Sequence, residues 1–235
     1  MTLIRSLVFL LLQIVLTPIF STAALLTFPL PPLTRYRYIA SYARTMLWLL
    51  RVVCGIRHEV RGSENIPAEP SIVLCKHQSA WETLALQAVF PPQVWVLKRE
   101  LLWLPFFGWG LAMTSPIAIN RSNGKGAMRQ LLKQGKERLK QGFFVVIFPE
   151  GTRIPYGKRG KYKIGGALLA ASSGAPVVPV AHNAGRLWAR AAFIKRPGVI
   201  TMSIGKPIIT QGHKAEDINA QVEAWIEDEV RNLPH

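Results

Sequence analysis

Hydrophobic residues in this chain fall into short runs that alternate with longer amphipathic stretches. Residues 126–141 carry apolar side chains at helical spacing until Gly142 ends the pattern, and residues 216–231 form a second amphipathic helix. The short runs predict strands at residues 71–75, 94–97, 117–119, 143–148, 177–181 and 199–204. Strands that alternate with helices predict an α/β fold, a single domain with a mixed, largely parallel sheet flanked by helices.

The N-terminal part of the chain follows a different pattern. From Ser6 to Leu33 no residue is charged, and residues 7–26 alone are nearly long enough to cross a hydrocarbon core, which takes about 20 residues. Residues 36–56 place arginines among Trp, Tyr and Leu, which favours a helix at a membrane interface whose arginines reach the headgroups. A core helix with a basic edge is the alternative for this second segment.

Three interpretations of the apolar run remain open. It is a signal peptide cleaved near residues 21–23, a full membrane span, or a half-inserted anchor. The anchor is suggested by Pro18, which is expected to interrupt the helix, and by the prolines at 29, 31 and 32, which are expected to end it. All but the first interpretation predict a membrane-associated protein.

A division of the chain follows from these patterns. We expect N-terminal membrane-associated helices at residues 1–60 and a catalytic domain at residues 61–235, with the boundary in a polar loop near residues 57–66. Arg5 alone precedes the apolar run, whereas five arginines follow it up to Arg57. The positive-inside rule therefore places the folded domain in the cytoplasm, at the inner membrane.

The charge of the chain is strongly positive and unevenly distributed. The formal net charge is +16, and six of the 13 acidic residues lie between Glu216 and Glu229. Such a surface attracts polyanions, and the apolar N-terminus favours an anionic membrane over nucleic acid as the partner. Two cysteines, Cys54 and Cys75, lie in apolar runs, which predicts buried, reduced thiols rather than a disulfide or a metal motif.

Residues 76–82, Lys-His-Gln-Ser-Ala-Trp-Glu, follow the first predicted strand of the folded domain. Ser79 and Glu82 have the spacing of a capping box, so a helix is expected to start at Ser79. His77 then lies in the turn before this helix, where its ring can meet the Glu82 carboxylate. In the functional interpretation His77 is a general base that Glu82 orients. In the alternative, Glu82 only caps its helix and His77 is a turn residue.

Two further strand ends carry charged residues. Lys98-Arg99-Glu100-Leu101 leads into an aromatic run with Pro105 and Gly108, where the alternative is a solvated charge cluster beside packing or membrane contacts. Residues 148–153, Phe-Pro-Glu-Gly-Thr-Arg, follow another apolar run. Gly151 lets a ligand approach the backbone, and the Arg153 guanidinium can donate two hydrogen bonds to a phosphate. The basic stretch behind it has neither a Walker motif nor a G-x-S-x-G elbow.

These blocks, in this order and followed by Val178-Pro179-Val180, resemble the glycerolipid acyltransferases over roughly residues 70–185. Two positions depart from the family's pattern. Glu82 stands where the family usually has Asp, and Lys76 stands where it usually has Asn. Glutamate keeps the charge and adds one methylene, so the pair with His77 can still form.

The resemblance implies transfer of a fatty acyl group from acyl-CoA or acyl carrier protein to the sn-2 hydroxyl of 1-acyl-sn-glycerol-3-phosphate, giving phosphatidic acid. His77 would be the general base and Glu82 its orienter. Arg153 would hold the phosphate, and Glu150 would orient Arg153 or a substrate hydroxyl. The substrate-binding residues would be Lys98, Arg99, Glu150, Gly151, Thr152 and Arg153.

No covalent acyl-enzyme is needed, because the thioester donor is already activated, and no cofactor is expected. No metal is expected either, since the remaining histidines, His58, His182, His213 and His235, are scattered, and His182 suits a hydrogen bond at a strand end. Two alternatives stay open beside the acyl transfer to lysophosphatidate. The acceptor is another lysolipid, such as a lyso-ornithine lipid, or the protein is a non-catalytic, membrane-bound binder of anionic lipids.

Overall fold

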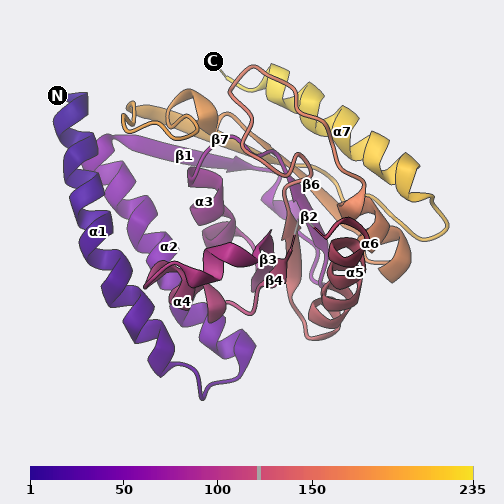
Figure 1. Cartoon of the computed structure of the whole chain (residues 1–235). Coiled ribbons are helices and arrows are strands. Elements are labelled where there is room, and N and C mark those ends of the chain that lie inside the picture. Colours follow the sequence, from indigo (N-terminus) through magenta and orange to yellow (C-terminus); the bar gives the residue numbers. More distant parts are fainter. Residues whose placement is uncertain (121–122, 235) are drawn as a thin grey trace.

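The computed structural model describes residues 1–120 and 123–234 (Figure 1). Its centre is a seven-stranded sheet in the order β1-β7-β6-β2-β5-β3-β4. The strands are β1 (Ile56–Arg61), β2 (Ile72–Cys75), β3 (Gln93–Lys98), β4 (Ile117–Ile119), β5 (Phe144–Ile147), β6 (Val177–His182) and β7 (Gly198–Ile204). In the described part of the chain the named strands pair in parallel except β6 with β7. The expected mixed, largely parallel sheet is confirmed.

Helices cover both faces of this sheet. Side chains alternate along each strand, so Val73 and Cys75 of β2 face one core while Ile72 and Leu74 face the other. The first core is closed mainly by α1 (Thr2–Leu26), α2 (Pro32–Cys54) and α3 (Trp81–Val89). The second is closed mainly by α5 (Gly124–Lys140), α6 (Gly165–Ser173) and α7 (Ala215–Asn232). Burial on both faces explains why the central strands are apolar at successive positions.

The shorter elements lie in the connections. They are α4 (Phe107–Ala112) and the 3₁₀ turns η1 (Ser63–Asn65), η2 (Arg99–Trp103) and η3 (Ala184–Arg186). Segment η2–α4, which we define as residues 99–112, follows β3 and packs against α1. It carries the aromatic run of the sequence and brings it to the same side of the molecule as the N-terminal helices (Figure 1).

The six strands expected from the sequence are β2 to β7, each within one residue at either end, and the two amphipathic helices are α5 and α7. The domain boundary near residues 57–66 stays a prediction, but the structure has a strand there that was not expected. Residues 57–61 belong to β1, an edge strand that pairs with β7, rather than to a polar loop. The sequence pattern did not indicate β1, because an exposed edge strand lacks the apolar run of a buried strand. The N-terminal helices therefore end at Cys54, and the sheet begins at Ile56.

The N-terminal helices form an antiparallel pair that packs against the rest of the molecule. The prediction that Pro18 interrupts the first helix is wrong, since α1 continues through it to Leu26. The helix tolerates the one backbone hydrogen bond that Pro18 cannot donate. In the same turn, the Thr17 hydroxyl donates to the Gln13 carbonyl (2.6 Å). Cys54 and Cys75 are buried free thiols, as expected.

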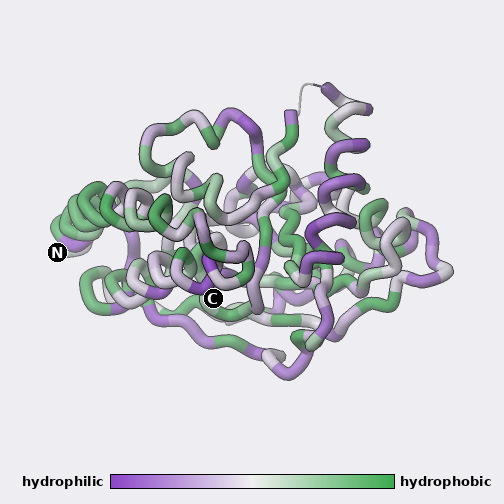
Figure 2. The backbone as a smooth tube through the Cα atoms, turned by 90° about the horizontal axis from the view of Figure 1, so that it is seen from below, coloured by the Kyte–Doolittle hydropathy of each residue, from purple (hydrophilic) through white to green (hydrophobic). Residues whose placement is uncertain are grey.

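Helix α1 presents most of its apolar side chains to the outside. By length and composition it can cross a membrane, with a mean hydropathy of 2.2 and only 11% of its most apolar window buried. Figure 2 shows this hydrophobic helix as a continuous stretch at the N-terminal side of the molecule. Its exposed large apolar residues include Leu3, Ile4, Leu7, Leu11, Ile14, Val15 and Ile19.

Candidate active site

The site forms at the carboxyl ends of neighbouring strands β2, β5 and β3, where ligands bind in open α/β sheets. Residues 76–80, which we call the catalytic turn, connect β2 to α3. Helix α3 begins at Trp81 rather than at the expected Ser79. The reason is local, since the Ser79 hydroxyl accepts from the Trp81 amide (3.2 Å) and the Glu82 carboxylate accepts from the Ser79 amide (2.9 and 3.0 Å). These bonds hold Ser79 in the turn.

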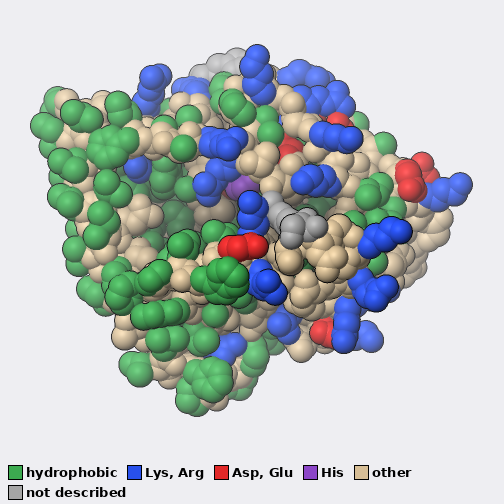
Figure 3. Space-filling model, viewed as in Figure 1, with side chains coloured by type: hydrophobic (Ala, Val, Ile, Leu, Met, Phe, Trp, Pro, Cys, Tyr) green, Lys and Arg blue, Asp and Glu red, His purple; other side chains and the backbone are tan. Residues whose placement is uncertain are grey.

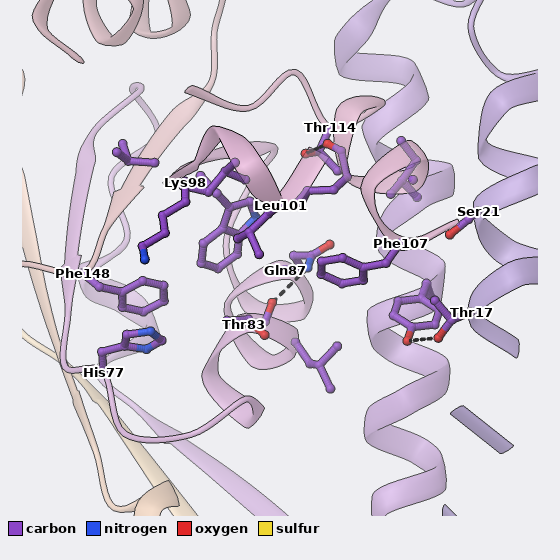
Figure 4. Close-up of a pocket in the computed structure, with 18 of the residues that line it drawn as sticks. Thr17, Ser21, His77, Thr83, Gln87, Lys98, Leu101, Phe107, Thr114 and Phe148 are labelled. Atoms are coloured by element: carbon purple, nitrogen blue, oxygen red, sulfur yellow. Dashed lines mark hydrogen bonds between the residues drawn. The ribbon is translucent and has the colours of Figure 1, made fainter. Parts of the chain in front are cut away.

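The His77 ring meets the Glu82 carboxylate across the start of this helix. The distance from His77 Nδ1 to Glu82 Oε1 is 2.7 Å, and the same carboxylate accepts from the Gln78 amide (3.1 Å). Glu82 therefore caps the turn and also holds the ring, and the role of His77 as a general base stays a prediction. An ionised carboxylate only accepts, so Nδ1 carries a proton, and in the neutral form of the ring Nε2 has the lone pair. The ring stacks on Phe148 with 3.9 Å between centroids (Figure 4).

The Glu82 carboxylate is completely buried and still ionised. Burial alone would raise the pKa of this carboxyl, but the His182 and His77 rings and the Ser79 amide together hold that pKa below its ordinary value. His182 Nε2 lies 3.8 Å from Glu82 Oε2. Sequence reasoning missed this neighbour, because only the pairing of strands brings the end of β6 beside the end of β2.

His182 itself is a hydrogen-bonding residue at a strand end, as expected. Its Nδ1 accepts from the Ala184 amide (3.2 Å), and its Nε2 donates to the Lys76 carbonyl (2.9 Å). Burial lowers the pKa of the ring, so His182 is neutral at physiological pH. At physiological pH it therefore supports the catalytic turn through hydrogen bonds, and its charge acts on Glu82 only in more acidic solution, where the ring is protonated.

A cavity of about 500 Å³ opens beside His77. Figure 4 shows His77, Phe148 and Lys98 at one end, with Thr83, Gln87 and Phe107 farther along. The cavity continues between α3, α4 and the N-terminal helices, and its polar end is basic. The lining residues from α1 and α2 are Thr17, Phe20, Ser21, Ala24, Ile39 and Tyr42.

The contribution of α1 to this cavity was not predicted. A signal for it exists in the sequence, because Thr17 and Ser21 are polar residues four apart in a largely apolar helix. Such a spacing puts both hydroxyls on one face. In the structure this face points inward, where the Thr17 hydroxyl lies 2.8 Å from the Tyr42 hydroxyl of α2 (Figure 4).

Four of the six expected substrate-binding residues line the cavity: Lys98, Gly151, Thr152 and Arg153. Arg153 Nε donates to the Ser79 carbonyl (2.8 Å), which fixes the guanidinium beside the catalytic turn. Gly151 has a φ of +68°, and a Cβ there would lie 2.7 Å from Lys163 Nζ, so the turn needs glycine. The Gly151 amide donates to the Phe148 carbonyl (2.9 Å). Of the two neighbouring backbone amides, that of Thr152 is therefore the candidate donor to a bound anion.

The other two expected substrate-binding residues lie elsewhere. Arg99 does not line the cavity, and its guanidinium lies 5.8 Å from the Trp103 ring centre. Glu150 has a fully buried side chain outside the cavity. Its oxygens accept from Lys76 Nζ (2.7 Å) and from the His77 amide (3.0 Å). The expectation that Glu150 orients Arg153 or a substrate hydroxyl is corrected accordingly, because both oxygens support the catalytic turn.

Within residues 1–120 and 123–234, no group of three or more metal-ligating side chains could hold an ion. His235, one of the scattered histidines, lies outside the described residues. The absence of a bound metal stays a prediction. The described site presents the His77 ring to a largely apolar cavity, with cations at the polar end. This arrangement suits removal of a proton from a hydroxyl that is about to attack a carbonyl.

Comparisons with known proteins agree with this chemistry. The family model described as Acyltransferase matches residues 57–183. The 1-acyl-sn-glycerol-3-phosphate acyltransferase of Pseudomonas aeruginosa is 47% identical over 98% of this chain and 91% of its own length. The alpha form of that enzyme from Bos taurus is 31% identical over an aligned region that covers 75% of this chain and 63% of the bovine protein.

One solved structure shares the fold. The crystal structure of the 1-acyl-sn-glycerophosphate (LPA) acyltransferase from Thermotoga maritima superposes with a TM-score of 0.83, covering 98% of this chain and 95% of its own. Its sequence identity is 24%, so this likeness speaks for the fold alone. The match extends through the N-terminal helices as well as the sheet.

Proposed function

The chain belongs to the acyltransferase family, and we propose that it transfers a fatty acyl group to the sn-2 hydroxyl of 1-acyl-sn-glycerol-3-phosphate, forming phosphatidic acid for phospholipid synthesis. The observation that carries the proposal is the 2.7 Å contact of His77 with buried Glu82 at the basic end of the cavity. Family membership makes the chain an O-acyltransferase, so the non-catalytic interpretation is set aside.

The proposed reaction uses His77 as a general base. Its Nε2 takes the proton of the sn-2 hydroxyl while that oxygen attacks the thioester carbonyl of acyl-CoA or acyl carrier protein. Glu82, bonded to Nδ1, stabilises the imidazolium that forms. The tetrahedral intermediate then releases the thiolate, which takes the proton from His77 to leave as a thiol. Both cysteines lie outside the cavity, in keeping with direct transfer.

The cavity has a place for each part of the acceptor and donor. Arg153, Lys98 and the Thr152 amide surround the polar end, where we place the phosphate. Phe20, Ala24, Ile39 and other apolar residues surround the remainder, where we place an acyl chain. Because α1 and α2 contribute these residues, the lipid would enter from the membrane side of the molecule.

Membrane association follows from the apolar α1 and the lipid acceptor of the relatives. We place the protein at the inner membrane with the catalytic domain in the cytoplasm. Helix α1 is integral to the fold, since Phe9 is fully buried with its ring 5.9 Å from that of Trp188. The Ser6 hydroxyl also accepts from the Lys195 amide (2.9 Å). These contacts favour a retained anchor over a cleaved signal peptide.

Segment η2–α4 extends the proposed membrane contact beyond α1. Figure 3 shows hydrophobic side chains gathered on the side of the molecule where the N-terminal helices and α4 lie, with Lys and Arg side chains next to them. The exposed large apolar residues of the segment are Leu101, Trp103, Leu104, Phe106, Phe107 and Trp109. Aromatic and basic side chains in this arrangement suit the interface of an anionic bilayer.

The test is acyl transfer by the purified full chain to a panel of lysolipids, with the products identified by mass. We expect phosphatidic acid from 1-acyl-sn-glycerol-3-phosphate with an acyl-CoA or acyl carrier protein donor, and none from the His77→Ala variant. Preferred transfer to a lyso-ornithine lipid would replace the proposed acceptor. Substantial activity of a folded His77→Ala variant would remove the base assignment.

A further inference from the structure

The first residue of the catalytic turn is a lysine without access to solvent. Lys76 follows the last residue of β2, and its side chain is fully buried. Its Nζ donates to Glu150 Oε1 (2.7 Å), to Glu227 Oε1 (2.6 Å) and to the Lys158 carbonyl (3.4 Å). An ammonium has three donors, and each of them here has an acceptor. A buried lysine needs such complete pairing, because an unpaired charge inside a protein is strongly unfavourable.

Glu150 connects this lysine to the backbone of His77. One Glu150 oxygen accepts from Lys76, and the other accepts from the His77 amide (3.0 Å). The His77 carbonyl accepts from the Ile154 amide (2.7 Å). Both backbone polar groups of His77 are therefore tied to the segment after β5. The position of the His77 ring consequently depends on where the Glu150 carboxylate lies.

Glu227 brings the C-terminal helix into the same cluster. Helix α7 packs on β6 and α6, on the face of the sheet opposite α1 (Figure 1). Glu227 Oε1 accepts from Lys76 and also from the Tyr162 hydroxyl (2.8 Å). Burial, reinforced by the neighbouring Glu227 charge, raises the pKa of Tyr162, so this hydroxyl keeps its proton and donates. Helix α7 is thus joined to the catalytic turn through an ion pair between the buried Lys76 and the partly buried Glu227.

We propose that Lys76, Glu150 and Glu227 form a largely buried charge network that sets the position of His77, so that Glu227 on α7 is a positioning residue for acyl transfer. One lysine and two glutamates give the network a charge of −1 (+1 − 2). Without the Glu227 charge, Lys76 is balanced by Glu150 alone. The Glu150 carboxylate is then drawn toward the ammonium, and its bond to the His77 amide weakens.

The kinetic test compares two substitutions on the same helix, and it rests on the proposed function. In Glu227→Gln, the amide oxygen still accepts from Lys76, so the fold is kept while the charge is lost. We expect kcat to fall about 10-fold, because His77 is misplaced, and the KM for lysophosphatidate to stay within about 2-fold, because Arg153 and Lys98 are untouched. The matched control is Glu223→Gln, whose partner Arg159 has a side chain 67% exposed.

The control variant should keep both kcat and KM within about 2-fold of the parent. A Glu227→Gln protein with parental kcat, or an equal loss in both variants, would overturn the inference. If circular dichroism shows that Glu227→Gln is not folded, the same kinetic comparison is made with Glu227→Asp. Its carboxylate is one methylene shorter, and we expect kcat to fall about 3-fold at unchanged KM. An unchanged kcat in that variant contradicts the network.

A spectroscopic test needs no acyl transfer. In protein labelled with ¹⁵N-histidine, the His77 amide is identified by its loss in His77→Ala. We expect its proton to move upfield in Glu227→Gln, because the hydrogen bond to Glu150 weakens, and to stay in place in Glu223→Gln. An unmoved resonance overturns the inference. If the resonance moves in Glu227→Gln but the parent protein acylates no lysolipid, the proposed function alone is contradicted.

Discussion

At the scale of single residues, the site is built from side chains that each serve both structure and chemistry. Glu82 satisfies the amides of Gln78 and Ser79 and also holds the His77 ring. Arg153 is fixed by the Ser79 carbonyl and lines the cavity. Substitutions at such positions separate the two contributions when the capping bonds can be kept and only the charge is removed.

Glu82→Gln should lower kcat about 100-fold or more while the protein stays folded. The amide oxygen still caps the Ser79 amide, but a neutral group no longer stabilises the imidazolium. Glu82→Asp keeps the charge with one methylene less, so its loss should be smaller than that of the Gln variant. Steady-state kinetics and a thermal melt measure both effects. Equal kcat values in the Gln variant and the parent would mean that Glu82 only caps the turn.

Arg153→Ala should raise the KM for lysophosphatidate about 10-fold or more, with a smaller change in kcat. The guanidinium can donate two charge-assisted hydrogen bonds to the phosphate, and alanine donates none. Arg159→Ala is the control, because this arginine of the same loop pairs with Glu223 away from the cavity. A KM unchanged by Arg153→Ala would place the phosphate elsewhere.

At the scale of elements, the N-terminal helix pair completes the cavity that the sheet alone leaves open. Helix α1 approaches α4 closely at Gly110, where a Cβ would lie 2.8 Å from the Ser21 hydroxyl oxygen. Thr17, Ser21 and Ala24 occur at spacings of four and three residues, and all three line the cavity. The size of this space is therefore set by which side chains α1 carries on its inner face.

Ala24→Phe should shift the acyl-chain preference toward shorter chains. Ala24 is buried and lines the cavity, so a phenyl ring would occupy space that we assign to an acyl chain. Leu25→Phe is the control, because its side chain is exposed and does not line the cavity. Competition between acyl donors of different length measures the preference. An unchanged preference in a folded Ala24→Phe variant would place the chain outside this cavity.

At the scale of the whole molecule, apolar and basic surfaces lie next to each other. Exposed apolar residues cover α1 and segment η2–α4, and the chain carries a net charge of +16 (Figure 3). A bilayer with anionic headgroups satisfies both, since the apolar side chains enter the interface and the cations contact phosphates. The mouth of the cavity would then face the layer in which the acceptor resides.

Trp103→Glu should reduce acyl transfer to lysophosphatidate in anionic vesicles about 5-fold, because it removes an interfacial anchor and adds a negative charge. Transfer to a short-chain, water-soluble acceptor should be unchanged. The control Ile209→Glu replaces another exposed apolar residue, 66% exposed against 68% for Trp103, near the start of α7. Equal losses on both kinds of acceptor would show that Trp103 acts on the site rather than on the membrane.

Much of the secondary structure could be predicted because its signals are local. Buried strands such as β5 and β6 are apolar at successive positions, and α5 and α7 repeat with the helical period. Strand β1 was missed because it lies at the sheet edge with a polar sequence and depends on its pairing with β7. Helix α6 was missed because its small and apolar residues give no polar face.

The sequence by itself determined which reactive side chains stand at the strand ends, including His77, Glu82 and Arg153, because each lies in a compact motif whose residues are neighbours in the chain. Only the tertiary structure decided what surrounds these motifs. In the tertiary structure Glu150 binds the His77 amide, although the sequence assigned it to the substrate. Arg99 lies outside the cavity, and His182 lies next to Glu82. The physical reason is that burial and ion pairing depend on which strands and helices are adjacent in space.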